Sequence, residues 1–235
     1  MKQRIWELDA LRGLCILGMV VVHLFYDLTY LFYLFPEPAV FVFLQRWGGI
    51  LFLLISGICV TLGSHPVKRG LLVFSCGLVC SAVTAGMYLF GFADSSILIY
   101  FGVLHCLGCC MLLWPLLKKL PVWALGVLGV LLAAVGLYFS TSVLVDFPYL
   151  IPLGLFPASY ASSDYFPLLP NLGYFLLGAF LGKTLYRSKQ TLFPKANPNH
   201  PVLAFLRWWG SWSLPLYMLH QPILTGLVYL ILCLR

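Results

Sequence analysis

The feature that most constrains this chain is a succession of apolar stretches, each about 20 residues long, separated by short polar segments. A helix needs about 20 apolar residues to cross the hydrocarbon core of a bilayer. The pattern therefore predicts an all-α integral membrane protein, a bundle of about seven transmembrane helices forming a single domain over 1–235. The expected spans are Leu8–Phe32, Val40–Gly63, Gly70–Gly91, Ile97–Leu117, Pro121–Ser140, Leu169–Arg187 and Trp212–Leu234.

Composition excludes the other classes of protein. Hydrophobic residues make up 62% of the chain and charged residues only 9%, whereas a soluble domain carries about 25% charged residues. This excludes a soluble enzyme, a disordered chain and a secreted disulfide scaffold. The eight cysteines lie inside apolar stretches and are expected to be packing residues. The segment from His105 to Cys110 has a CxxC spacing, but no further ligands lie near it in sequence, so no metal site is expected.

The net charge of +7 is a topology signal, because twelve of the fourteen basic residues fall in alternate segments between the apolar stretches. We therefore expect a cytoplasmic N-terminus, an external C-terminus and no nucleic-acid partner. The segment 188–207 is expected to be a basic cytoplasmic loop that ends in an interfacial Arg207-Trp208-Trp209. The segment 141–168, rich in Pro and aromatic residues, is expected to be an external loop that folds back onto the outer mouth of the bundle.

Ionisable residues are concentrated in the first span, which carries Asp9, Arg12, His23 and Asp27. Arg12 and His23 are eleven residues apart, about 1100° of helix, and so share a face about 16 Å apart along the axis. His23 and Asp27 are i, i+4 neighbours, so the carboxylate can hold one imidazole nitrogen as a donor and leave the other as a base. The pair could instead only lock helix packing. Because charge within a bilayer is costly, four such groups on one span favour a functional role.

Five further polar residues lie within or beside the apolar stretches. His105 is in the fourth span, and Asp164 precedes the sixth, where it either binds a ligand or solvates the loop. Arg46 either snorkels to the interface or binds an anionic group. His220 and Gln221 precede Pro222, which cannot donate a backbone hydrogen bond and would free carbonyls for a ligand. Together with the first span they form a polar track suited to a channel, a transporter or a transmembrane group-transfer enzyme.

Five segments, in order along the chain, resemble one family of membrane acyltransferases. The family is the heparan-α-glucosaminide N-acetyltransferase catalytic-domain family, in its bacterial branch. The first segment is Leu8-Asp9-Ala10-Leu11-Arg12-Gly13, with Met19 and His23 following it. The others are Phe52-Leu53-Leu54-Ile55-Ser56-Gly57, Phe101-Gly102-Val103-Leu104-His105, Asp164-Tyr165-Phe166-Pro167-Leu168-Leu169-Pro170 and Ser213-Leu214-Pro215-Leu216-Tyr217-Met218-Leu219-His220-Gln221-Pro222.

The resemblance implies a reaction and roles for these residues. Acetyl-CoA or another short acyl-CoA would dock from the cytoplasm as the acyl donor. The acyl group would pass within the bilayer to a sugar amine or hydroxyl of an envelope glycan on the far side. His23 would be the general base or a transient acyl carrier, with Asp27 and His105 as further catalytic residues. The predicted donor-binding residues are Asp9, Arg12, Lys68, Arg69, His220 and Gln221, and the predicted acceptor-binding residues are Arg46 and Asp164.

Two other functions stay open at the level of sequence. A transporter or flippase would use the same His, Asp and Arg residues to relay protons or bind a solute. A membrane partner subunit would need none of them for chemistry. The five segments favour the acyltransferase, and the absence of an internal repeat weighs against common transporter architectures. The resemblance places the protein in a bacterial cytoplasmic membrane as a multi-pass protein and leaves a homodimer open.

Overall fold

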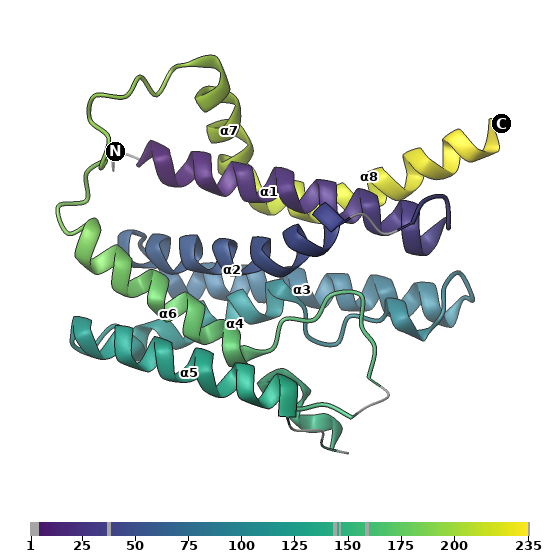
Figure 1. The fold of residues 1–235 in the computed structure, drawn as a ribbon, viewed down its shortest axis with the longest axis horizontal. Coiled ribbons are helices and arrows are strands. Elements are labelled where there is room, and N and C mark those ends of the chain that lie inside the picture. The colour runs from purple at the N-terminus through teal and green to yellow at the C-terminus, as the bar shows by residue number, and fades with distance from the viewer. Residues whose placement is uncertain (1–4, 37–38, 143–144, 146, 158–159, 235) are drawn as a thin grey trace. The chain divides into compact units, whose positions relative to one another are not determined.

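The computed structural model describes residues 5–36, 39–142, 145, 147–157 and 160–234. The elements of this part of the chain are helices, together with one isolated β-bridge between Phe101 and Tyr165. Six helical stretches in it are long and apolar enough to cross a membrane, and a seventh, α4, is apolar but shorter. One of these helices lies at each of the seven predicted spans, which confirms the expected multispanning all-α class (Figure 1).

The helix bounds agree with the predicted spans to within a few residues except in two places. The long helices are α1 (Trp6–Tyr26), α2 (Ala39–Leu62), α3 (Pro66–Leu89), α5 (Val122–Ser142), α6 (Leu168–Leu185) and α8 (Ser213–Cys233). A π-helix, η1 (Asp27–Leu31), extends α1 directly. The two differences are α4 (Val103–Leu117), which begins six residues after the predicted fourth span, and α7 (Pro201–Ser211), a helix at the end of the predicted basic loop.

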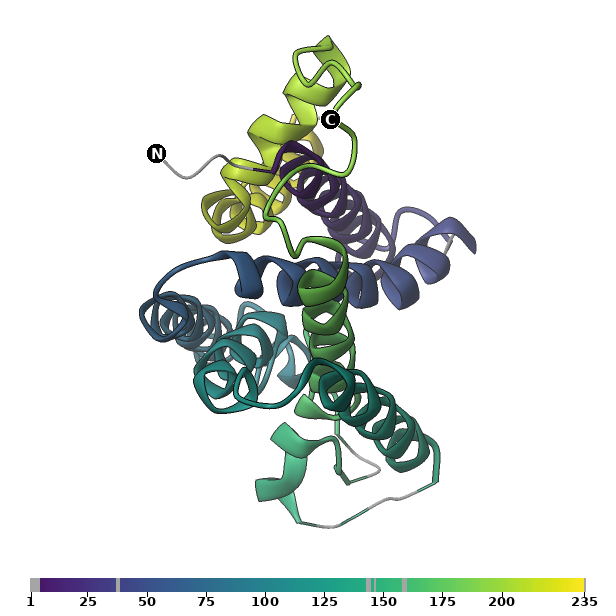
Figure 2. The same cartoon turned by 90° about the vertical axis from the view of Figure 1, so that its left-hand side faces the viewer.

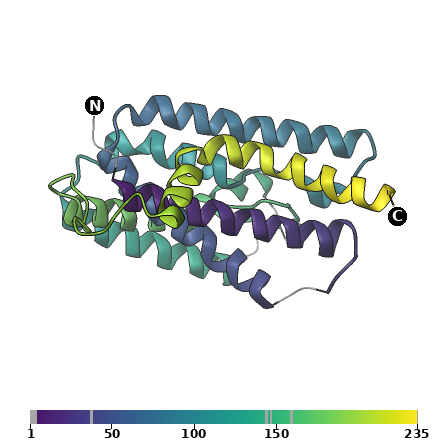
Figure 3. The same ribbon diagram turned by 90° about the horizontal axis from the view of Figure 1, so that it is seen from above.

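The contacts divide the chain into two compact units. The first unit comprises Met1–Ile55 and Ser188–Arg235, and the second comprises Ser56–Arg187. In the first unit α1 packs against both α7 and α8, so helices from the beginning and the end of the sequence lie side by side (Figures 2 and 3). In the second unit α3 packs against α4 and α5 against α6.

The contact of α1 with α7 depends on two glycines. A Cβ atom added to Gly13 would meet the backbone carbonyl of Leu206, and one added to Gly210 would meet that of Asp9. The two backbones therefore approach more closely than any larger residue would allow. Glu7, which is 4% exposed, accepts hydrogen bonds from the Thr191 hydroxyl and the Leu192 N–H, both at 2.8 Å. These contacts hold the segment before α7 against the start of α1.

The fourth apolar stretch is not helical throughout. A short 3-10 helix, η2 (Ser95–Ile97), is followed by an extended segment, and α4 begins only at Val103. Non-helical backbone at membrane depth must find hydrogen-bond partners within the protein. The Ser81 hydroxyl donates to the Ile99 carbonyl at 2.6 Å. The Ser162 hydroxyl donates to the Leu98 carbonyl and the Ser163 hydroxyl to the Ile97 carbonyl, both at 2.7 Å. Residues outside this stretch thus supply the hydrogen-bond partners that allow its first residues to stay non-helical.

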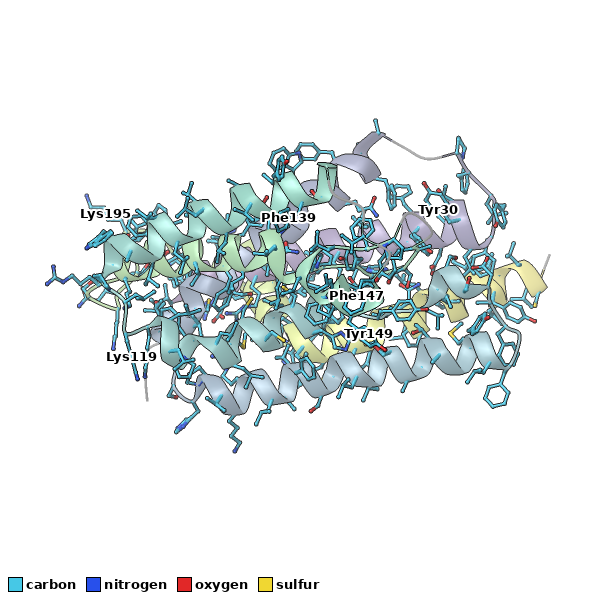
Figure 4. All side chains as sticks on the ribbon, turned by 90° about the horizontal axis from the view of Figure 1, so that it is seen from below. Tyr30, Lys119, Phe139, Phe147, Tyr149 and Lys195 are labelled. Carbon is cyan, nitrogen blue, oxygen red and sulfur yellow. The ribbon has the colours of Figure 1, made fainter. Side chains whose placement is uncertain are left out.

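The segment that contributes those hydroxyls also contacts the start of α4 through Asp164, while the external position predicted for 141–168 remains a prediction. The segment contains a second 3-10 helix, η3 (Pro148–Leu153), and the Tyr165 hydroxyl donates to the Ile151 carbonyl at 2.7 Å. The rings of Phe147 and Tyr149, 5.1 Å apart, are labelled in Figure 4. Burial raises the pKa of the Tyr165 phenol above its ordinary value. Asp146, which the sequence placed in this loop, lies outside the described residues.

A histidine pair between the first and last helices

His23 of α1 and His220 of α8 lie face to edge in the first unit. Their ring centroids are 4.7 Å apart and the rings are inclined at 66°. His220 is 9% exposed, and its ring also lies edge-on to Tyr217, at 5.5 Å between centroids. The sequence predicted both histidines as site residues but gave them different roles, and the structure brings them into contact.

A backbone contact fixes which nitrogen of His220 carries the proton. Its Nδ1 atom lies 2.6 Å from the Tyr217 carbonyl oxygen. A carbonyl can only accept a hydrogen bond, so the neutral ring must carry its proton on Nδ1 and its lone pair on Nε2. The Nε2 atom is buried and has no hydrogen-bond partner among the described residues. His220 therefore presents an unused basic nitrogen inside the first unit.

Asp27 does not form the expected pair with His23. Its carboxylate is fully buried and accepts hydrogen bonds from Gln221 Nε2 at 2.6 Å and from the Thr225 hydroxyl at 3.0 Å. Among the described residues it has no hydrogen bond to His23. The i, i+4 spacing is correct, but α1 changes to a π-helix at Asp27, and α8 offers two donors that the local sequence could not reveal.

The contact between α1 and α8 holds a second acceptor that has no hydrogen-bond donor. While Gln221 donates to Asp27 through Nε2, its Oε1 atom is buried and has no partner within the described part of the chain. A buried polar atom without a partner costs free energy, so such atoms are rare in proteins and call for an explanation. His220 Nε2 and Gln221 Oε1 are neighbours on α8, and both accept rather than donate.

His105 has the opposite arrangement in the second unit. Its Nδ1 atom accepts a hydrogen bond from the Gly102 N–H at 3.2 Å, which uses the lone pair that a base would need. Its ring is held between Phe101, stacked at 5.6 Å, and Phe74, edge-on at 5.3 Å. The side chain thus caps the start of α4. The Nδ1 atom of His105 is therefore not available as a base. The catalytic role that the sequence gave to His105 remains a prediction.

Asp164 also acts at the start of α4. Its Oδ2 atom accepts a hydrogen bond from the Val103 N–H at 3.1 Å, and a Cβ on Gly102 would collide with the same oxygen. A carboxylate at this position satisfies an orphan N–H and complements the helix dipole. Asp164 thus has a structural role at the start of α4. Its predicted role in binding the acceptor substrate remains a prediction.

The other predicted residues lie in different surroundings. Arg12 forms an ion pair with Asp9 at 3.2 Å, one turn earlier on α1. Lys68 and Arg69 are exposed at the start of α3, in the second unit. The side chain of Arg46, on α2, lies outside what the structure describes. Their assignments to donor and acceptor remain predictions.

The sequence reasoning missed Glu7 and Thr225. The only available signal for Thr225 was its i, i+4 spacing from Gln221 on an apolar helix, which places both side chains on one face. Nothing in the sequence linked Glu7 to residues almost 200 positions later. Among the described residues, no group of three or more His, Cys, Asp and Glu side chains is arranged to hold a metal ion.

Comparison with known proteins identifies the family. No curated protein and no solved structure matches the chain. The model of the family described as "Heparan-alpha-glucosaminide N-acetyltransferase, catalytic" matches residues 4–222, nearly the whole chain, including both histidines of the pair. The chain therefore belongs to the heparan-α-glucosaminide N-acetyltransferase catalytic-domain family.

Proposed function

We propose that this protein is a membrane acetyltransferase that moves an acetyl group from cytoplasmic acetyl-CoA to an amine of an extracytoplasmic glycan or similar acceptor. Membership of the family indicates acetyltransferase activity at a membrane. The observation that carries the finer proposal is the buried Nε2 atom of His220, which has a lone pair, a fixed tautomer and no partner in the described part of the chain. A positioned imidazole of this kind is suited to general base catalysis.

The proposed reaction step uses His220 Nε2 as the base. It removes a proton from the acceptor amine as the amine nitrogen forms a bond to the thioester carbonyl carbon. The carbon–sulfur bond then breaks, and the imidazolium returns the proton to the CoA thiolate, leaving an amide and the CoA thiol. The Tyr217 carbonyl accepts from Nδ1 throughout and so stabilises the imidazolium.

His23 can enter the reaction in one further way. Its ring lies against that of His220, so one His23 nitrogen can instead attack the thioester carbon first, as the acyl carrier inferred from the sequence. The carbon–sulfur bond breaks, the CoA thiolate takes the proton from the other His23 nitrogen, and the acetylimidazole then passes its acetyl group to the amine. In that route His220 serves only the second transfer. Labelled acetyl-CoA supplied without an acceptor separates the two routes, because a carrier leaves label on the protein and a direct transfer does not.

The polar atoms at the contact between α1 and α8 favour a substrate with an amine over one with a hydroxyl. His220 Nε2 and Gln221 Oε1 are both acceptors, and Asp27 beside them has no ion pair among the described residues. A primary amine offers hydrogen for more than one acceptor, whereas a hydroxyl offers only one. Glucosamine and glucose, which differ in one amine for one hydroxyl, are matched probes of this preference.

The test is the transfer of labelled acetyl from acetyl-CoA to glucosamine by the protein in nanodiscs. His220→Gln should stay folded yet lose transfer by at least about a hundredfold, the typical contribution of a general base. His200→Ala, at an exposed histidine of the same unit, is the matched control and should transfer normally. Normal transfer by a folded His220→Gln protein would exclude the base assignment, and His23→Gln then decides whether His23 holds that role.

Binding of the donor is a separate prediction. Acetyl-CoA should raise the melting temperature of the protein by mass action, since a ligand that binds only the folded state stabilises it. Arg12→Ala should weaken this shift if the guanidinium meets the CoA phosphates. A transporter that binds no acyl-CoA would show no shift at any donor concentration, and this result would favour the transporter over the enzyme.

A further inference from the structure

Asp27 joins two helices through a carboxylate that no solvent reaches. Its oxygens contact two side chains one turn apart on α8, Gln221 and Thr225. Its own backbone N–H bonds to the carbonyls of His23 and Leu24, at the junction where α1 becomes the π-helix η1. One residue thus connects the end of α1 to two successive turns of α8.

Two bonds to residues four apart determine more than a single bond could. A helix held at one point can still rotate about that point, whereas bonds at i and i+4 fix both its rotation and its position along its axis. His220 directly precedes Gln221, so a rotation of α8 that breaks the bonds to Asp27 also turns the His220 ring away from His23. A rotation of 10–20° is already enough to spoil a catalytic geometry.

A carboxylate suits this position better than an amide. Gln221 and Thr225 both donate to it, and an ionised carboxylate has two oxygens that only accept. Hydrogen bonds to a charged acceptor are about twice as strong as those between neutral groups. Without them the buried charge would be strongly unfavourable, so the rotation of α8 that satisfies both oxygens is favoured over its neighbours.

We propose that Asp27 is a positioning residue that acts on His220 through Gln221 and Thr225, and not on His23 directly. The three side chains form a clamp that sets the rotation of α8 and so the direction of His220 Nε2. The effect of the clamp on rate rests on the proposed function. Its effect on the His220 ring does not, and can be measured with no acetyl transfer at all.

The first measurement is ¹⁵N NMR of the protein in nanodiscs with labelled histidine. The chain has only five histidines, and His220→Gln identifies the His220 signals by their loss. The wild-type protein should show the Nδ1-protonated tautomer at His220, because protonated and unprotonated ring nitrogens differ widely in shift. Asp27→Leu should change these signals, since α8 is then free to rotate.

The second measurement exchanges the partners. Gln221→Glu alone faces one carboxylate with another and should disturb the His220 signals. Asp27→Asn with Gln221→Glu restores an amide-to-carboxylate bond in the reverse direction and should bring the signals back. Thr225→Val removes one hydroxyl at constant shape, and the conservative Thr225→Ser should recover what Thr225→Val loses. Gly226→Ala, whose added Cβ meets nothing within 4 Å, is the matched control on α8.

Kinetics then separate positioning from stability. Asp27→Leu should lower kcat by about tenfold or more while KM for acetyl-CoA stays within about twofold, because a misplaced base affects the transition state more than donor binding. The exchanged pair should recover kcat. Unchanged His220 signals and unchanged kcat in folded Asp27→Leu protein would overturn the clamp. Absence of transfer by the wild type would overturn the proposed function alone, because the NMR result still decides the clamp.

Discussion

Three buried or half-buried carboxylates of this chain each accept hydrogen bonds from a segment distant in sequence. Glu7 holds the segment before α7, Asp27 holds α8, and Asp164 holds the start of α4. A buried carboxylate is tolerated only where such bonds replace water. Within an apolar bundle these residues therefore act as fixed points between segments, and their identical chemistry serves different purposes according to what donates to them.

Asp164 offers a test of this structural role. Asp164→Ala leaves the Val103 N–H without its acceptor and should lower the free energy of unfolding by about 0.5–2 kcal/mol, the usual cost of losing an N-cap. Asp94→Ala is the matched control, because Asp94 caps only the exposed η2 through Ser96. The readout is thermal unfolding in detergent. A smaller loss for Asp164→Ala than for Asp94→Ala would contradict the role.

At the scale of elements, two features depart from a simple bundle. α4 has only 15 residues, about 22 Å of helix, against a hydrocarbon core of about 30 Å. Hydrogen bonds from neighbouring segments replace the missing turns. The second feature is α7, which lies against the first half of α1 through the Gly13–Gly210 contact. Its outward side exposes Val202, Phe205 and Trp208, each about half exposed, as expected of an amphipathic helix at a membrane interface.

The close approach of α1 and α7 predicts a strong position dependence for glycine substitutions in α1. Gly13→Ala places a methyl group against the Leu206 carbonyl and should destabilise the protein by about 1–3 kcal/mol through overpacking. Gly18→Ala, in the same helix with nothing within 4 Å of the added Cβ, should be neutral or stabilising. Thermal unfolding of both variants is the measurement, and equal melting temperatures would refute the backbone contact.

At the scale of the whole molecule, the distribution of charged residues predicts the orientation of the protein in the membrane. Basic residues alternate with acidic or neutral segments, and this pattern predicts that the N-terminus and the Lys118–Lys119 turn lie in the cytoplasm. The helix α5 separates that turn from the segment 141–168, which contains Tyr149. The 21 residues of α5 measure about 32 Å, enough to cross the hydrocarbon core of the bilayer.

Cysteine labelling tests this sidedness. In a variant without the native cysteines, Tyr149→Cys should react with an impermeant thiol reagent added to intact cells, since Tyr149 is 79% exposed. Lys119→Cys should react only after the cells are permeabilised. Both positions are labelled in Figure 4. Reaction of Lys119→Cys from outside, with Tyr149→Cys protected, would reverse the assigned topology.

The sequence by itself determined the class of the molecule and the approximate positions of its seven apolar helices, although not α7 or the late start of α4. Spans of about 20 apolar residues can be recognised in the sequence alone, because the thickness of the bilayer sets their length and all backbone hydrogen bonds must form within each helix. The family followed from five short segments and was confirmed over residues 4–222, while its bacterial branch remains a prediction. His23, Asp27, His220 and Gln221 were all singled out, because polar groups are costly in such spans.

Only the tertiary structure decided which of these residues meet. The i, i+4 rule paired Asp27 with His23, but the donors of α8, nearly 200 residues later, satisfy both carboxylate oxygens instead. Sequence could not distinguish His105 from His220 either, since the backbone around each ring decides whether a carbonyl takes a proton or an N–H uses a lone pair. Hydropathy reports the transfer of a segment into the bilayer, whereas hydrogen-bond partners depend on contacts between segments that have no fixed spacing along the chain.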